Sequence, residues 1–121
     1  MLVVENEPAV RTITTRALRE AGFVVLEADD GRDALAVLSQ SFASVDLVLA
    51  DVLMPRLGGL KLADELEESR PGLPIVLMSG YPAGDADLTS RAGTRRRWIG
   101  KPFSPDQLLR IVRSLLPGGG G

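Results

Sequence analysis

The chain has 121 residues, of which 45% are hydrophobic and 25% are charged, so its size and composition are those of one globular domain. It contains no cysteine and no histidine, which excludes disulfides, thiol catalysis, histidine general bases and the common kinds of zinc site. The net charge of −2 gives no electrostatic case for binding nucleic acid. No apolar stretch approaches the roughly 18 residues that cross a bilayer, and no signal-peptide pattern opens the chain, so we expect a cytoplasmic protein without a membrane partner.

The first part of the chain predicts a strand, a helix and a second strand. Apolar runs at residues 2–4 and 23–26 predict the two strands. Between them, Pro8 suits the first turn of a helix, and Gly22 suits the position just past its end. The apolar face of this helix is expected to comprise Val10, Ile13, Ala17, Leu18 and Ala21.

The middle of the chain predicts two more helices and two more strands. A short helix is expected at residues 34–38. The run at residues 47–50 is apolar throughout, as strands buried on both faces are, and it ends in Asp51. Residues 59–69 have the apolar spacing of a helix, and residues 75–78 predict the fourth strand.

The last third of the chain has a weaker pattern. Residues 81–97 are poor in apolar positions, and we expect one short, loosely held helix there. The three arginines at 95–97 are interpreted as a solvated run rather than a docking patch. A short fifth strand is expected at residues 98–99, followed by a helix with Ser104 as its N-cap and Pro105 at its first position.

Five apolar strands that alternate with helices are typical of a doubly wound α/β fold, with a parallel sheet between two layers of helices. Right-handed crossovers limit the strand order, and we expect 2-1-3-4-5, a flavodoxin-like three-layer sandwich. Residues 1–117 are expected to form this domain, and the glycine-rich residues 118–121 to form an unstructured tail.

Polar side chains lie at the ends of four of the expected strands. The strand order places Glu5 and Asn6 beside Asp51. It places Ser79 and Lys101 on the other side of that aspartate. Neighbouring carboxylates repel each other, which a lysine or a cation can relieve, and oxygen ligands of this kind suit Mg²⁺. A carboxylate can accept a phosphoryl group as an acyl phosphate while a metal ion and a lysine neutralise its charge, so these residues predict phosphoryl transfer to aspartate.

Four segments resemble the signature segments of response-regulator receiver domains, in the family's order and spacing: MLVVENEPAVR, DLVLADVLMPRLGG, VLMSGYP and WIGKPF. The resemblance implies that Asp51 is the phosphoacceptor, that Ser79 is the switch hydroxyl and that Lys101 contacts the phosphoryl group. It also implies that Trp98 occupies the switch-aromatic position and that the Lys101–Pro102 peptide bond is cis.

The resemblance further implies a cofactor and a partner. Mg²⁺ would be held by Glu5, Asn6, Asp51 and the backbone carbonyl of Leu53. The phosphoryl donor would be a histidine kinase or a phosphotransfer protein, and the opening ENEPAVR resembles the receivers of hybrid sensor histidine kinases. Such a domain is not an enzyme beyond self-catalysed phosphotransfer and autodephosphorylation, and the resemblance allows a weak homodimer.

Other functions stay open at this point. The family usually has an acidic residue where this chain has Asn6, so the main alternative is a pseudo-receiver, an interaction module with impaired metal binding. A small phosphatase with an aspartyl-phosphate intermediate would carry a second acid two residues after its nucleophile, where this chain has Leu53. No glycine-rich phosphate loop follows the first strand, which argues against a dinucleotide-binding or P-loop protein.

Overall fold

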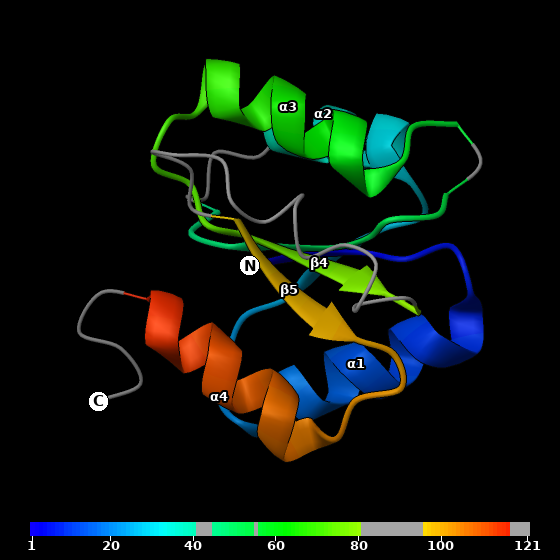
Figure 1. Ribbon diagram of the computed structural model, residues 1–121, viewed down its shortest axis with the longest axis vertical. Helices are drawn as coiled ribbons and strands as arrows, with labels where there is room; N and C mark the ends of the chain where they lie inside the picture. The colour runs from blue at the N-terminus through cyan, green and yellow to red at the C-terminus, as the bar shows by residue number, and fades with distance from the viewer. Residues whose placement is uncertain (41–44, 55, 81–95, 117–121) are drawn as a thin grey trace.

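Five parallel strands form one sheet at the centre of the protein (Figure 1). The computed structural model describes residues 1–40, 45–54, 56–80 and 96–116. The strands are β1 (Leu2–Val4), β2 (Leu26–Ala28), β3 (Val48–Asp51), β4 (Ile75–Ser79) and β5 (Arg96–Gly100). Their order across the sheet is β2-β1-β3-β4-β5, which confirms the order expected from the sequence.

Helices cover both faces of the sheet, as a three-layer sandwich requires. They are α1 (Pro8–Glu20), α2 (Gly31–Gln40), α3 (Gly59–Ser69) and α4 (Pro105–Leu115). Figure 1 shows α2 and α3 on one side of the sheet, and α1 and α4 on the other. Within the described ranges, no helix combines the length and the apolar character that crossing a membrane requires.

The strand β3 lies in the middle of the sheet, between β1 and β4. All four of its residues are buried, which confirms the expectation from its apolar run. Leu49 packs into the cluster of side chains beneath α1 and α4, and Ala50 packs into the cluster beneath α2 and α3. Val4 pairs with Ala50 and Asp51 pairs with Met78, so the carboxyl ends of the three central strands meet at one edge.

Local signals place the helix ends where the sequence predicted them. Pro8 occupies the first turn of α1, and Gly22 follows the helix with a φ of 99°, a backbone conformation that side chains disfavour. Ser104 begins α4 with a reciprocal cap, because its hydroxyl accepts from the amide of Gln107 at 3.1 Å and its own amide donates to the Gln107 side chain at 2.8 Å.

The expected apolar face of α1 is wrong at Ile13, whose side chain is 66% exposed, whereas Thr14 and Thr15 are buried. The Thr14 hydroxyl donates to the carbonyl of Val10 at 2.8 Å, so it is satisfied within its own helix and can face the core. Hydropathy does not record this bond, and for that reason the pattern selected the isoleucine.

The expected second strand is also wrong in its bounds, because β2 spans Leu26–Ala28 and not residues 23–26. Backbone pairing decides its extent: Leu2 pairs with Leu26, and Val4 pairs with Ala28. Val24, although apolar, is exposed. A strand at the edge of a sheet has one neighbour only, so its residues need not be apolar, and an apolar run does not locate the pairing.

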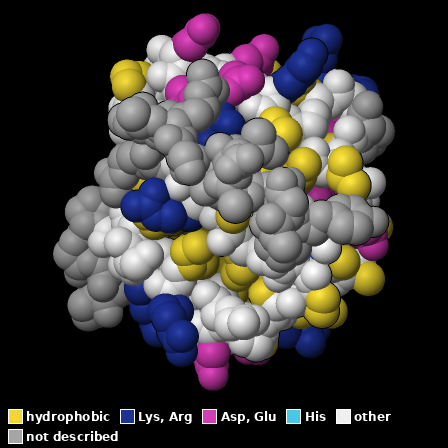
Figure 2. All heavy atoms as spheres, in the orientation of Figure 1, with side chains coloured by type: hydrophobic (Ala, Val, Ile, Leu, Met, Phe, Trp, Pro, Cys, Tyr) yellow, Lys and Arg dark blue, Asp and Glu magenta, His cyan; other side chains and the backbone are white. Residues whose placement is uncertain are grey.

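The strand β5 is longer than expected, and it begins at Arg96. The expectation of a solvated run is wrong for this arginine, whose side chain is only 4% exposed. Its guanidinium binds Glu67 of α3 through two bonds of 2.6 and 3.0 Å, and it also binds Asp64. Acidic side chains gather over α3 at the top of Figure 2, so a basic strand end meets an acidic helix. The expected helix within residues 81–97 and the expected tail at 118–121 lie outside the described residues, apart from the end of the former.

Candidate functional site

Three charged side chains meet at the carboxyl edge of the sheet. Glu5 follows β1, Asp51 ends β3 and Lys101 follows β5. The ammonium nitrogen of Lys101 lies 2.9 Å from Oδ2 of Asp51 and 3.1 Å from Oε1 of Glu5. The structure therefore brings together three residues that the sequence predicted to meet, and one cation bridges two carboxylates.

Burial governs the electrostatics of this group. Glu5 is fully buried, and this burial raises its pKa above the ordinary value. The Glu7 amide and the Lys101 ammonium lower that pKa, while the charge of Asp51 raises it further. Burial alone would lower the pKa of Lys101, but the bonds to Asp51 and Glu5 outweigh it and raise that pKa. Lys101 is therefore charged at any physiological pH, and the two carboxylates compete for its single charge.

Backbone amides fix the other oxygen of each carboxylate. The amide of Glu7 donates to Oε2 of Glu5 at 3.1 Å, and the amide of Leu53 donates to Oδ1 of Asp51 at 3.2 Å. Both amides belong to the segments that leave the strands, so the turn after each strand orients the carboxylate that precedes it. The Asp51 side chain is consequently held in place before any ligand arrives.

An open pocket of about 670 Å³ lies above this group. It is lined by Asn6, Glu7, Asp51, Val52, Leu53, Ser79, Gly80 and Lys101. Asn6, Leu53 and Ser79 are thus placed around Asp51, as expected from the sequence. Glu5 does not line the pocket, because it is buried behind the lysine bridge.

Glu7 lines the pocket, and the sequence interpretation missed it. Glu7 occupies the N-cap position of α1. However, its side chain makes no capping hydrogen bond. Glutamate is not among the preferred N-cap residues, and its presence at this position is the feature of the sequence that could have indicated a role for its carboxylate in the pocket.

Ser79 and Trp98 lie at different depths. Ser79 ends β4 beside Asp51 in the pocket, and its carbonyl accepts from the Lys101 amide at 2.7 Å. Trp98 pairs with Leu77 within the sheet and packs against the core beneath α2 and α3, so its ring does not line the pocket. The Lys101–Pro102 bond is cis, as the resemblance implied.

The oxygen atoms of the pocket fit a hard divalent cation. The described residues hold no group of three acidic side chains that could bind a metal by themselves. An ion beside Asp51 would therefore depend on amide, backbone and water oxygens as well. Mg²⁺ accepts such a set, since it keeps several waters and takes only one or two carboxylates.

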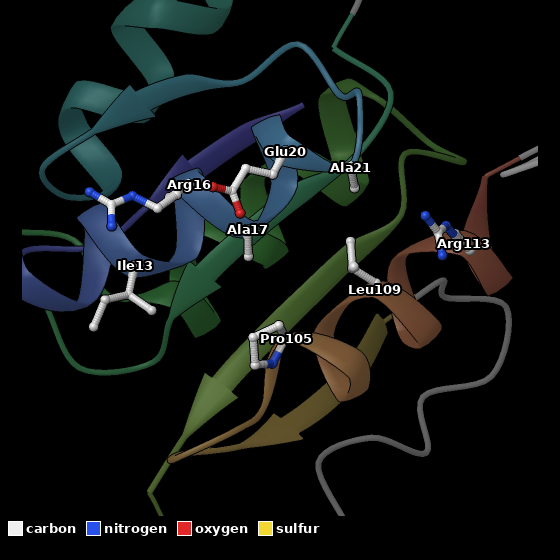
Figure 3. A pocket seen from close by; sticks show the side chains of 8 residues that line it. All are labelled: Ile13, Arg16, Ala17, Glu20, Ala21, Pro105, Leu109 and Arg113. Atoms are coloured by element: carbon white, nitrogen blue, oxygen red, sulfur yellow. The ribbon is translucent and has the colours of Figure 1, made fainter.

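A second hollow, of about 420 Å³, lies between α1 and α4 (Figure 3). None of its lining residues lines the pocket at Asp51. Figure 3 shows apolar side chains on its floor, with the charged ends of Arg16, Glu20 and Arg113 around it. It offers no arrangement for chemistry, and the strand-end pocket is the candidate site.

Known proteins share both the sequence and the fold. Residues 1–113 match the family described as the response regulator receiver domain. The sensor kinase CckA of Brucella abortus is 35% identical over 116 residues, which are 96% of this chain and 12% of that protein. The probable transcriptional regulatory protein TcrX of Mycobacterium tuberculosis is 30% identical over 96% of this chain and 49% of its own length. The chain thus spans half or less of these curated relatives.

Solved structures give the same result. The receiver domain of the hybrid histidine kinase CckA has a TM-score of 0.80 and 32% identity, over 95% of this chain and 96% of that domain. The response regulator TrrA of Thermotoga maritima, solved in complex with Mg²⁺ and BeF, has a TM-score of 0.82 and 30% identity, over 95% and 96%. The match over nearly the whole chain, in sequence and in fold, places this protein in the response regulator receiver domain family of two-component signalling.

Proposed function

We propose that Asp51 is the phosphoacceptor of this receiver domain and that Lys101 prepares it. The observation that carries the proposal is the bridge from Lys101 to Asp51 and Glu5, at 2.9 and 3.1 Å, in a pocket open to solvent. A carboxylate held at both oxygens is already oriented for attack, so little conformational freedom is lost on the way to the transition state.

In the proposed reaction, an oxygen of Asp51 attacks the phosphorus of a phosphohistidine. The phosphorus–nitrogen bond breaks, and its electron pair stays on the imidazole nitrogen of the donor. Lys101 then faces the new phosphoryl oxygens, and the hydroxyl of Ser79, across the same pocket, donates to one of them. These contacts exist only after transfer, and they are what would couple phosphorylation to β4 and β5.

Asn6, Asp51 and the carbonyl of Leu53 are the groups that would hold Mg²⁺, with Glu5 supplying negative charge from behind the lysine. When bound, the ion would neutralise charge on the transferring group. Glu7 at the rim adds a carboxylate that the expectation from sequence had not counted. The phosphoryl donor is proposed to be a histidine kinase or a histidine phosphotransfer protein, and a weak homodimer stays a prediction.

The test is phosphorylation by acetyl phosphate, with and without Mg²⁺, read by intact mass. We expect the wild-type chain to gain one hydroxylamine-labile phosphoryl group, and Asp51→Asn to gain none, because an amide is a far weaker nucleophile. Asp46→Asn is the matched control, since Asp46 precedes the same strand, β3, and its carboxylate pairs with the N-terminal amine. A phosphoryl group on Asp51→Asn refutes the assignment, and a wild-type chain that takes none favours the pseudo-receiver.

A further inference from the structure

An exposed arginine ties the loop after the proposed phosphoacceptor to the start of the neighbouring helix, α2. Arg56 lies between β3 and α3, and its guanidinium binds the carboxylate of Asp30 at the start of α2 through bonds of 2.6 and 3.2 Å. It also binds Asp33 at 2.8 Å. Asp30 is only 4% exposed, and it caps α2 by accepting from the Asp33 amide at 3.0 Å. The arginine therefore binds a carboxylate that is already fixed by burial and by its capping bond, and we name this contact the Arg56–Asp30 clamp.

The backbone reinforces the clamp at the next residue. The amide of Gly31 donates to the carbonyl of Leu57 at 3.0 Å. A Cβ atom on Gly31 would lie only 2.5 Å from that carbonyl oxygen, so the loop approaches α2 as closely as a glycine permits. Two consecutive residues of the loop are thus fixed to the start of α2, which lies beside α3 on the same face (Figure 1).

The same loop carries one of the groups at the candidate site. Leu53 donates its amide to Oδ1 of Asp51 and lines the pocket. The two ends of the loop are themselves joined, since the amide of Gly59 donates to the carbonyl of Val52 at 3.2 Å. A loop closed at its base can still tilt as a unit. Met54 and Leu57 pack against the core, and the contacts of Arg56 and Leu57 with α2 oppose that tilt further.

We propose that Arg56, acting through Asp30, is a positioning residue that holds Leu53 beside Asp51 for binding of a divalent cation. This inference rests on the proposed function of the same pocket. Arg56 does not line that pocket, so its effect has to travel through the loop. Groups hydrogen-bonded to a metal ligand typically change metal affinity by about 10- to 100-fold when they are removed, and we expect a contact that acts through the loop to lie at the lower end of this range.

The sign of the effect separates positioning from simple electrostatics. Arg56 carries a positive charge near the site, so its removal should tighten binding of a cation if charge alone mattered. Loss of positioning should weaken binding instead. An ordinary surface ion pair, which contributes roughly 0 to 1 kcal/mol to stability, would leave the affinity for the cation unchanged.

The experiment titrates Mg²⁺ into the full chain by calorimetry, without a phosphoryl donor. We expect Arg56→Ala to weaken Mg²⁺ binding about tenfold and Arg56→Lys to restore part of the loss, because lysine keeps the charge but not the fork that grips Asp30. Arg19→Ala is the matched control: Arg19 is similarly exposed and binds Glu27 at 3.2 Å, far from the loop, so its removal should leave the affinity unchanged. Arg56→Gln repeats the test if the alanine variant proves unfolded by circular dichroism.

A double-mutant cycle asks whether the two residues act as a unit. Asp30→Asn keeps a capping side chain but loses the charge, and it should weaken Mg²⁺ binding in the same direction. Combined with Arg56→Ala, it should add nothing further. Unchanged or tighter Mg²⁺ binding in Arg56→Ala would refute the proposal that Arg56 positions Leu53. Additive losses in the double variant would refute the proposal that Arg56 acts through Asp30. A wild-type chain that binds Mg²⁺ but takes no phosphoryl group refutes the proposed function alone, and one that binds no Mg²⁺ overturns both.

Discussion

Two groups in this protein place one cation between two carboxylates, and they are built in opposite ways. At the strand edge, Lys101 is 19% exposed, while its partners Glu5 and Asp51 are buried behind it. At the start of β5, Arg96 is the buried member, and its partners Asp64 and Glu67 lie toward solvent. The buried member of each group is the charge that needs a partner within the protein: negative at the strand edge and positive at the start of β5.

The difference separates a structural contact from a reactive one. Arg96 spreads its charge over a planar fork that matches two carboxylates, and water hydrates the acids on their outer side. Lys101 is a single point charge that two buried acids share, so part of their negative charge remains uncompensated. A site in that condition attracts further cations. The Arg96 group, whose carboxylates are hydrated, has no such uncompensated charge and attracts no further cation.

The largest expected effect comes from removing the shared cation. Lys101→Ala leaves Glu5 and Asp51 buried without their counter-ion, and we expect the free energy of unfolding to fall by about 3 kcal/mol near pH 8. Because burial raises the pKa of Glu5, the folded protein binds that proton more tightly than the unfolded chain, and this contribution to stability is lost as pH rises through the raised pKa. Loss of Lys101 removes a group that lowers this pKa. The destabilisation should therefore be smaller at acidic pH than near pH 8, because Glu5 binds a proton as the pH falls.

Urea denaturation at both pH values measures this difference, with Arg19→Ala as a control whose effect should not depend on pH. An equal loss of unfolding free energy at both pH values would show that protonation of Glu5 does not contribute to the stability of the fold. The same variant should take up a phosphoryl group more slowly from acetyl phosphate. Wild-type uptake and wild-type switching would place Lys101 outside the reaction.

Removing the buried cation should have a smaller and purely structural effect. In Arg96→Ala the two carboxylates can be hydrated, so we expect a loss of about 2 kcal/mol in the free energy of unfolding and no change in Mg²⁺ binding. Arg97→Ala is the neighbouring control: within the part of the chain that the structure describes, its guanidinium donates to a backbone carbonyl alone, and its removal should cost less than about 0.5 kcal/mol. A changed affinity for Mg²⁺ in Arg96→Ala would break the contrast between the two groups.

Adding a charge at the strand edge should sharpen the contrast. Asn6 lines the pocket, and Asn6→Asp should tighten Mg²⁺ binding about tenfold, or about 1.4 kcal/mol. A unit charge near a divalent ion is worth more than this, but the carboxylate loses more hydration than the amide when it binds. Glu7 already supplies negative charge at the rim, which limits the gain. Calorimetric titration with Mg²⁺ measures the affinity, and Gln40→Glu is the control, because it adds the same charge outside the pocket and should leave the affinity unchanged. Equal affinities for wild type and Asn6→Asp would show that residue 6 does not face the ion.

The smallest expected effect is optical. Trp98 is the only tryptophan, and it lies on β5 between Arg96 and Lys101. Its indole nitrogen is buried and has no hydrogen-bond partner among the described residues, so a small shift of the strand should alter its surroundings. We expect Mg²⁺ with beryllofluoride to change its fluorescence in the wild type and in Arg96→Ala alike. An unchanged fluorescence in both proteins would show that the surroundings of the Trp98 ring do not change on activation, so that it takes no part in the switch.

The sequence predicted the parts of this fold that depend on long apolar runs and on local capping. The buried run at residues 47–50 required a central strand, and Ser104 with Pro105 required a helix start, because these signals depend on a few adjacent residues. The pairing of Glu5, Asp51 and Lys101 followed from the strand order alone. It needed no knowledge of side-chain positions.

The remaining features depend on contacts between distant residues, which no local pattern records. Arg96 looks solvated in a run of three arginines until α3 places Asp64 and Glu67 against it. Thr14 looks polar until its hydroxyl bonds the preceding turn. The burial of Glu5 behind Lys101 was equally hidden, since spacing brings groups together without saying which one faces water.

The bridge from Lys101 to Glu5 joins residues 96 positions apart, and the bridge to Asp51 spans 50. Contacts between such distant residues form late in folding, because the intervening chain must first be ordered. On a ribosome, the first strands and their helices can collapse while β5 is still being made. The pocket then lacks its lysine until the chain has been extended through Lys101. Because loss of Lys101 is expected to slow phosphoryl uptake, we expect a nascent receiver to compete poorly with finished copies for phosphoryl groups until the whole sheet has been assembled.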